Sequence, residues 1–92
     1  MTLQLAESIS IQALGWLAAE PERIGGFLAQ TGIDPANLRA AANETAFLAA
    51  VLDHLCADES LLLAFCANDG LDPQAVDRAR QMLAGPPGEW SA

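Results

Sequence analysis

Few side chains in this sequence could carry out catalysis. The chain contains one histidine, His54, two cysteines, Cys56 and Cys66, and neither lysine nor tyrosine. His54 and Asp58 are four residues apart, so their side chains come within reach of each other if one helix continues through both. A thiol beside the histidine could act as a nucleophile. Because most enzyme mechanisms need more acid–base groups, we expect no enzymatic activity. A small enzyme that uses His54 with a cysteine is the last of three functional hypotheses, and the other two are given below.

The same residues predict no metal or cofactor site. Cys56 and Cys66 lack the spacing of zinc ligands and lie in apolar helical stretches, which is typical of buried, reduced thiols rather than a disulfide. His54 lies about a quarter turn from the centre of an apolar stripe, which predicts a half-exposed position at the edge of the core. The sequence therefore indicates no catalytic residue, cofactor, metal ion or small-molecule substrate. The stripe contains Phe47, Leu48, Val51, Leu52 and Leu55.

The charge of the chain argues against nucleic acid and lipid as partners. Twelve acidic residues against four arginines give a formal net charge of −8, which repels phosphate backbones and anionic membranes. Residues 28–38 and 65–76 nevertheless each follow a helix-turn-helix pattern, and Arg39, Arg78 and Arg80 fall on the helices that would read the DNA. An atypical helix-turn-helix DNA-binding regulator is therefore the second hypothesis.

Helix breakers and capping residues divide the chain into helical segments, and no segment shows the alternation of a strand. Acidic residues lie at several predicted helix starts, where negative charge is favourable. The sequence predicts an all-α fold, a compact bundle of five to six short helices. We expect these helices at Thr2–Ala19, Pro21–Thr31, Pro35–Ala42, Glu44–Ala57, Glu59–Asn68 and Pro73–Ala84.

Two helix boundaries have almost the same sequence and lie 38 positions apart. They are Gly32-Ile33-Asp34-Pro35 and Gly70-Leu71-Asp72-Pro73. Each supplies a left-handed helix stop, an apolar contact, an N-cap and a proline at the first helical position. The same offset aligns further apolar residues, which predicts two copies of a three-helix unit, at about 5–42 and 43–84, packed on each other. A chance match between stretches rich in alanine and leucine is the alternative. The aligned pairs are Leu14 with Leu52, Leu17 with Leu55, Phe27 with Phe65 and Ala41 with Ala79.

The first predicted helix is apolar on nearly every side. One stripe is predicted to face the core, and a second set of apolar residues covers much of the other side. Such a helix must be enclosed, either by the second three-helix unit or by another chain. The predicted core stripe is Leu5, Ile9, Ala13, Trp16 and Leu17, and the second set is Leu3, Ile11, Leu14 and Ala18.

The function that this pattern favours is a helical protein-interaction or self-association module. Its partner would be another protein or a second copy of the chain. Leu63 offers a similar contact in the second unit, because it points away from the apolar residues around it. The candidate contact residues are Leu3, Ile11, Leu14, Ala18 and Leu63.

The ends of the chain bear on its location. No lysine or arginine precedes Arg23, so the N-terminus does not resemble a secretory signal. The uncharged stretch Ser8–Ala19 is too short to span the roughly 30 Å of a bilayer core. We therefore expect a single cytoplasmic domain over residues 1–84, followed by a flexible tail rich in proline and glycine at 85–92, in which Trp90 either docks or is disordered.

Several segments carry a resemblance to a known family. They include Trp16-Leu17-Ala18, Pro21-Glu22-Arg23, Gly32-Ile33-Asp34-Pro35 and the run from Phe47 to Asp53. With these segments, the chain from about Leu5 to Leu83 resembles a bacterial family known as domain of unknown function 3572. The resemblance implies a short intracellular helical protein, without an assigned activity or catalytic residue. Glu20 stands before Pro21 where a short capping aspartate is expected, so this cap is predicted to be weak.

Overall fold

A computed structural model describes residues 1–84, and every regular element in that part of the chain is a helix. The predicted all-α fold is therefore confirmed. The flexible tail predicted at 85–92, with Trp90, lies outside the described residues. The helices are α1 (Leu3–Ala18), α2 (Pro21–Thr31), the 3₁₀ helix η1 (Pro35–Asn37), α3 (Leu38–Ala41), α4 (Thr45–Cys56), α5 (Glu59–Asp69) and α6 (Pro73–Ala84).

Short polar side chains cap most of these helices. Asp34 accepts a hydrogen bond from the backbone N–H of Ala36 at 2.9 Å, and Asp58 and Asp72 do the same at the starts of α5 and α6. Each bond satisfies a backbone donor that the first helical turn leaves free. Glu20 makes no such bond before α2, so the weak cap predicted there is confirmed.

Both predicted glycine stops adopt the left-handed backbone conformation. Gly32 has φ 74° after α2, and Gly70 has φ 66° after α5. Glycine reaches this region without the steric cost that a Cβ brings, so each residue ends its helix and turns the chain sharply toward the next aspartate cap.

The helix predicted at Pro35–Ala42 is wrong as a single element. The chain forms η1 first, and α3 then covers only Leu38–Ala41. Asn37, the last residue of η1, has φ −98° and ψ 0°, away from regular α-helical values. Asparagine is a poor helix former, because its side chain competes for backbone hydrogen bonds. The first half of the chain therefore lacks a full third helix.

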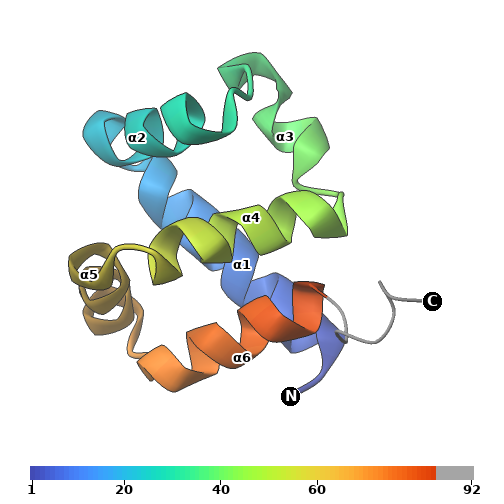
Figure 1. Cartoon of the computed structure of the whole chain (residues 1–92), viewed down its shortest axis with the longest axis vertical. Coiled ribbons are helices and arrows are strands. Elements are labelled where there is room, and N and C mark those ends of the chain that lie inside the picture. The colour runs from blue at the N-terminus through green and yellow to red at the C-terminus, as the bar shows by residue number, and fades with distance from the viewer. Residues whose placement is uncertain (85–92) are drawn as a thin grey trace.

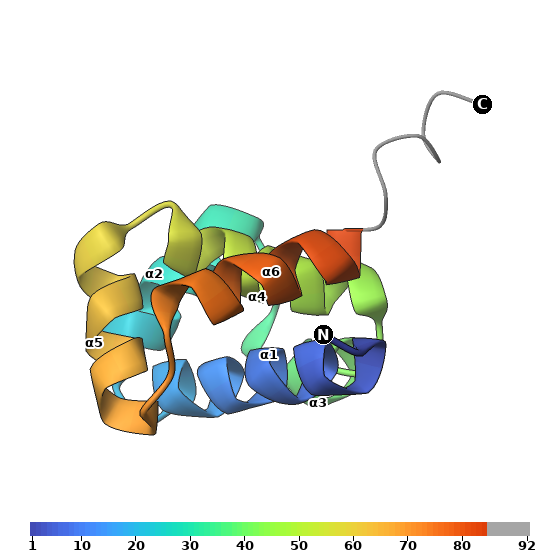
Figure 2. The same cartoon turned by 90° about the horizontal axis from the view of Figure 1, so that it is seen from below.

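Three helices form the centre of the molecule. α4 and α6 run beside each other on one side of α1, and both pack on it (Figures 1 and 2). α2 and α5 pack at one end of these three helices, and α3 lies at the opposite edge of the molecule from α6 (Figure 1). Of the described helices, none is both long enough and apolar enough to span a membrane.

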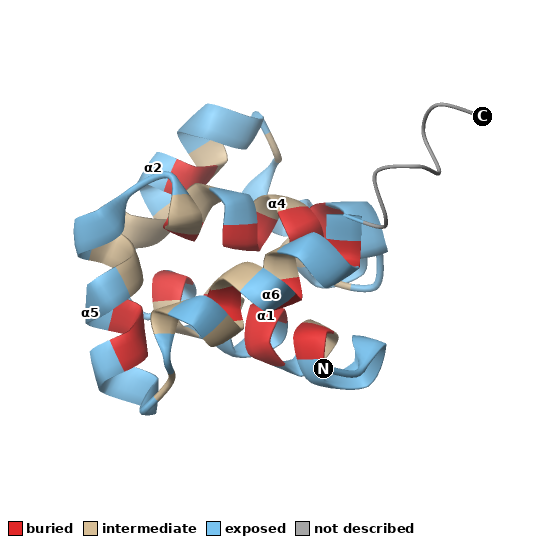
Figure 3. Cartoon of the chain, turned by 60° about the horizontal axis from the view of Figure 1, so that its bottom comes forward, coloured by how far each residue is buried: buried red, intermediate tan, exposed pale blue. Residues whose placement is uncertain are grey.

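The core lies where α1, α4 and α6 face one another (Figure 3). On α1 the predicted core residues Ile9, Ala13 and Leu17 are buried. Leu5 was expected there too, but it is 50% exposed, and Trp16 is half-buried. The buried face is centred on Ala6, Ala13 and Leu17, so Leu5 falls more than a quarter turn from its middle.

Two pairs of residues 38 positions apart, Phe27 with Phe65 and Trp16 with His54, have similar surroundings. Phe27 and Phe65 are both fully buried. The ring of Trp16 packs on Phe65 at 5.6 Å, and the ring of His54, 38 positions after Trp16, packs on Phe27 at 5.3 Å. Each contact joins a residue of one half of the chain to a residue of the other half. A pseudo-twofold axis between the halves would relate these two contacts to each other. The two-copy interpretation remains a prediction.

Candidate functional site

The sequence-predicted contact residues of α1 lie along one side of the helix. Ile11 is 52% exposed and Leu3 is 48% exposed. Ala18 is exposed too, while Leu14 is half-buried and packs against the core. We call the set Leu3, Ile11, Leu14 and Ala18 the α1 stripe. Within residues 1–84 most of this stripe is left open, so internal enclosure, one of the two alternatives drawn from the sequence, does not hold for Leu3, Ile11 and Ala18.

Leu63 is separate from the α1 stripe. It is 48% exposed, but it lies on α5. The five predicted contact residues thus divide into one stripe on α1 and one single leucine on another helix. Single exposed leucines are common on protein surfaces, whereas neighbouring ones on one helix are more informative.

Charge is nearly absent from α1. Glu7, which lies between Leu3 and Ile11 on the same side, is the one ionisable side chain within Leu3–Ala18. The chain has sixteen charged residues in all, the twelve acids and four arginines. A surface with little charge and several apolar side chains has the composition of the core of a protein–protein interface.

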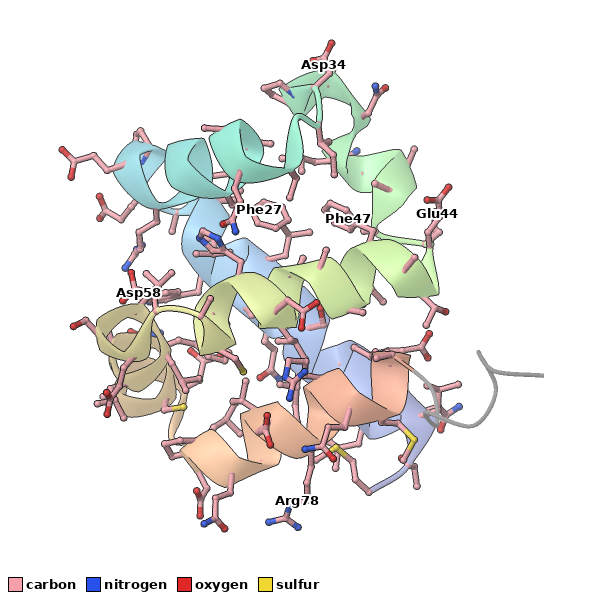
Figure 4. The ribbon with its side chains drawn as sticks, viewed as in Figure 1. Phe27, Asp34, Glu44, Phe47, Asp58 and Arg78 are labelled. Atoms are coloured by element: carbon pink, nitrogen blue, oxygen red, sulfur yellow. The ribbon has the colours of Figure 1, made fainter. Side chains whose placement is uncertain are left out.

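A groove of about 690 Å³ opens between α4 and the segment that leads from α2 into α3. Phe47 lines it, and Phe27 packs edge-on against Phe47 with 5.7 Å between ring centroids (Figure 4). Asp34 and Glu44 line the groove as well. Asn37 of η1 and Ala41 of α3 also line it.

His54 connects α4 to α2. Its Nδ1 lies 2.6 Å from Oε1 of Gln30, and its ring packs edge-on against Phe27. Burial lowers the pKa of His54 from its ordinary value, and the carboxylate of Asp58 opposes that shift. The predicted half-exposed position at the edge of the core is confirmed. Bonded in this way, His54 holds two helices together.

The two cysteines are free thiols, as predicted. Cys66 is buried, but Cys56 is only half-buried, which corrects the expectation of two buried thiols. Burial raises the pKa of both. A thiol with a raised pKa is protonated at neutral pH and is a weak nucleophile. Among the hydrogen bonds of residues 1–84, none joins His54 to a cysteine, so the enzyme alternative gains no support.

One charged cluster was missed by sequence reasoning. Arg80 on α6 bonds to Asp77 at 2.8 Å and forms an ion pair with Asp53 on α4 at 3.5 Å. The hydrogen bond from Arg80 is the largest cause that lowers the pKa of Asp77 below its ordinary value. The spacing of Asp77 and Arg80 on one helix could have revealed the first contact. No local signal marks the contact with Asp53.

The arginines proposed for DNA binding do not form one basic surface. Arg80 is engaged by two carboxylates, and Arg39 and Arg78 are exposed on α3 and α6. These two helices lie at opposite edges of the molecule, and Figure 4 places Arg78 far from Asp34, at the start of η1. Binding to DNA requires several positive charges along one phosphate track, so the helix-turn-helix alternative is weakened.

Comparison with known families agrees with the resemblance seen in the sequence. The model of a protein family of unknown function, DUF3572, matches residues 3–86. The chain belongs to this family. No curated protein and no solved structure gives a significant match. Membership in DUF3572 thus covers all the described helices and assigns no activity to any residue.

Proposed function

We propose that this member of DUF3572 is a protein-interaction module and that the α1 stripe is its contact surface. The observation that carries the proposal is the exposure of Ile11 and Leu3 on one side of a single helix. Exposed apolar side chains that gather on one surface are typical of interaction sites. The low charge of α1 supports the same conclusion, because charged residues are depleted at interface centres.

Other features of the fold support a role in binding rather than in catalysis. The histidine is bonded to Gln30, and the pKa values of the thiols are raised. The side chains that could do acid–base or nucleophilic chemistry thus serve packing. The exposed apolar residues of the α1 stripe, by contrast, lie outside the core that residues 1–84 form.

Site-specific crosslinking tests the proposal in the cells that make the protein. A photoreactive amino acid replaces Ile11, and in a matched control it replaces Gln12, which is exposed on α1 outside the stripe. We expect a crosslinked protein product from position 11, and little product from position 12. Adding Leu14→Glu should abolish the product, because a charge at an apolar contact is poorly solvated there.

Two outcomes would contradict this function. One is the absence of any crosslinked product at position 11. The other is an equal product at position 12, which would mean that the adducts report random collisions with α1. Circular dichroism of each variant tests whether its helices are intact.

A further inference from the structure

The segment that holds α2, η1 and α3, residues 21–41, contributes little to the core. We call this segment the arm. Phe27 is the one side chain that the arm buries, whereas α4 alone buries six. The arm also lies on the side of α4 away from α6 (Figure 1). Because most helix stability in proteins comes from tertiary packing, the arm is weakly stabilised in its place.

The packing between the arm and α4 is incomplete. The ring of Phe27 contacts Phe47 at 5.7 Å and His54 at 5.3 Å, and His54 bonds to Gln30 (Figure 4). Beside these contacts, hollows of about 690 Å³ and about 430 Å³ open between residues of the arm and residues of α4. Side chains that face an open space lose the dispersion contacts of a close-packed interior. One aromatic side chain therefore carries much of this attachment.

The helix α2 is also weak in itself. Gly25 and Gly26 lie in its middle, and both are exposed. A Cβ added at either position would meet no atom within 4 Å, so packing does not require glycine there. Each glycine makes the helix about 2- to 5-fold less favourable than alanine would. Isolated helices shorter than about 12 residues are marginal even without glycine, so α2 should lose its helical structure once it leaves the core.

The ends of the arm and its contact with α1 are no stronger. Glu20 and Glu44, at the N-caps of α2 and α4, make no side-chain capping bond. Arg23 stacks on the ring of Trp16 at 4.0 Å, but its buried Nε finds no hydrogen-bond partner within residues 1–84. A buried donor without a partner is costly, and water would satisfy it if the arm opened.

We propose that the arm is a separate cooperative unit of the native protein, which opens while α1, α4 and α6 stay packed on one another. Opening uncovers the rings of Phe27 and Phe47, so the open form presents apolar surface that the closed form hides. The open form is a minor state, and denaturation of the whole chain still occurs in a single transition. This inference concerns the conformation of the chain and is independent of the role of the α1 stripe.

Native-state hydrogen exchange of the full chain, followed by NMR, tests this proposal. We expect the amides of residues 28–31 in α2 to exchange through an opening whose equilibrium constant is roughly tenfold or more above that of global unfolding. Buried amides of α4 and α6 should exchange only through global unfolding. Exchange in α2 should also depend less on denaturant, because opening of the arm exposes less surface than unfolding of the whole chain.

Matched glycine substitutions separate the two kinds of opening. Gly25→Ala should slow exchange at residues 28–31 about 2- to 5-fold, because α2 is helical only while the arm is closed. Gly15→Ala adds the same methyl group at an exposed position of α1 that is equally free of neighbours. Since α1 stays helical in both forms, this control should leave exchange in α2 unchanged. Both substitutions should slow exchange in α6 alike, because both stabilise the chain against global unfolding.

Three results would overturn the proposal. Equal slowing of α2 by Gly25→Ala and Gly15→Ala would mean that α2 exchanges only when the whole chain unfolds. Amides of α2 that match those of α4 in opening constant and denaturant dependence would mean the same. Exchange in α2 that does not respond to Gly25→Ala would mean that single residues fray and that the arm does not open as a unit.

Discussion

The two halves of the molecule use the same turn but build different third segments after it. Gly32 and Gly70 share a left-handed backbone, and Asp34 and Asp72 each cap the following turn. In the second half, α6 then continues for twelve residues and packs into the centre. In the first half, helical structure ends at Ala41. A well-formed start is therefore not enough to extend a helix.

Three differences in sequence explain why the two segments differ. Asn37 stands where the second half has Ala75, the best helix former. Thr45 stands where the second half has Leu83, which is 5% exposed and anchors the end of α6. The first half also has no equivalent of the Asp77–Arg80 pair. Because most helix stability in proteins comes from tertiary packing, loss of the anchor matters more than loss of the pair.

The strongest test of equivalence between the halves is the pair of buried phenylalanines. Phe27→Ala and Phe65→Ala should each lower the free energy of unfolding by about 3–5 kcal/mol, because each leaves a cavity at a fully buried site. Chemical denaturation measures both values. If one substitution costs little while the other unfolds the protein, the two rings do not hold matching positions.

A single substitution should make the second half more like the first. Leu83→Thr removes the anchor of α6 and should cost about 2–4 kcal/mol, since it deletes buried apolar atoms and buries a hydroxyl. Met82→Thr, at a neighbouring position that is 39% exposed, is the control and should cost about 0.5 kcal/mol or less. Equal effects in thermal melts would show that α6 is not held by Leu83.

The smallest effect concerns the shared turn itself. Gly32→Ala and Gly70→Ala should each destabilise by about 1 kcal/mol through the positive φ alone, because an added Cβ would meet no atom within 4 Å at either site. Gly15→Ala in the middle of α1 is the matched control, and it should stabilise by about 0.5–1 kcal/mol. A neutral or stabilising result at Gly32 or Gly70 would contradict the common geometry of the turns.

Local chemistry predicted much of this fold. Proline at the first helical position predicted where α2 and α6 begin, and Gly32 predicted where α2 ends, because these residues act on the backbone nearest to them. The break at Asn37 was missed, since the length of a helix also depends on whether its later residues find something to pack against. Leu5 was misplaced for a related reason, because the centre of the buried face of α1 depends on where α4 and α6 lie.

The candidate site, like the fold, was predicted from the sequence only in part. The apolar character of Ile11 was visible in the sequence, but its exposure depends on where α4 and α6 pack on α1. The bond between His54 and Gln30 and the ion pair of Arg80 with Asp53 join segments that are distant in the chain. Such contacts carry no spacing signal in a single sequence.

The crossed aromatic contacts have a consequence for folding. Trp16 of the first half packs on Phe65 of the second, and His54 of the second packs on Phe27 of the first. Ser10 adds a buried hydrogen bond to the carbonyl oxygen of Leu48 at 2.8 Å. Neither half can complete its own core, so the chain should unfold in one cooperative transition. Separate fragments 1–42 and 43–84 should be largely unfolded alone and should recover helical structure only when they are mixed.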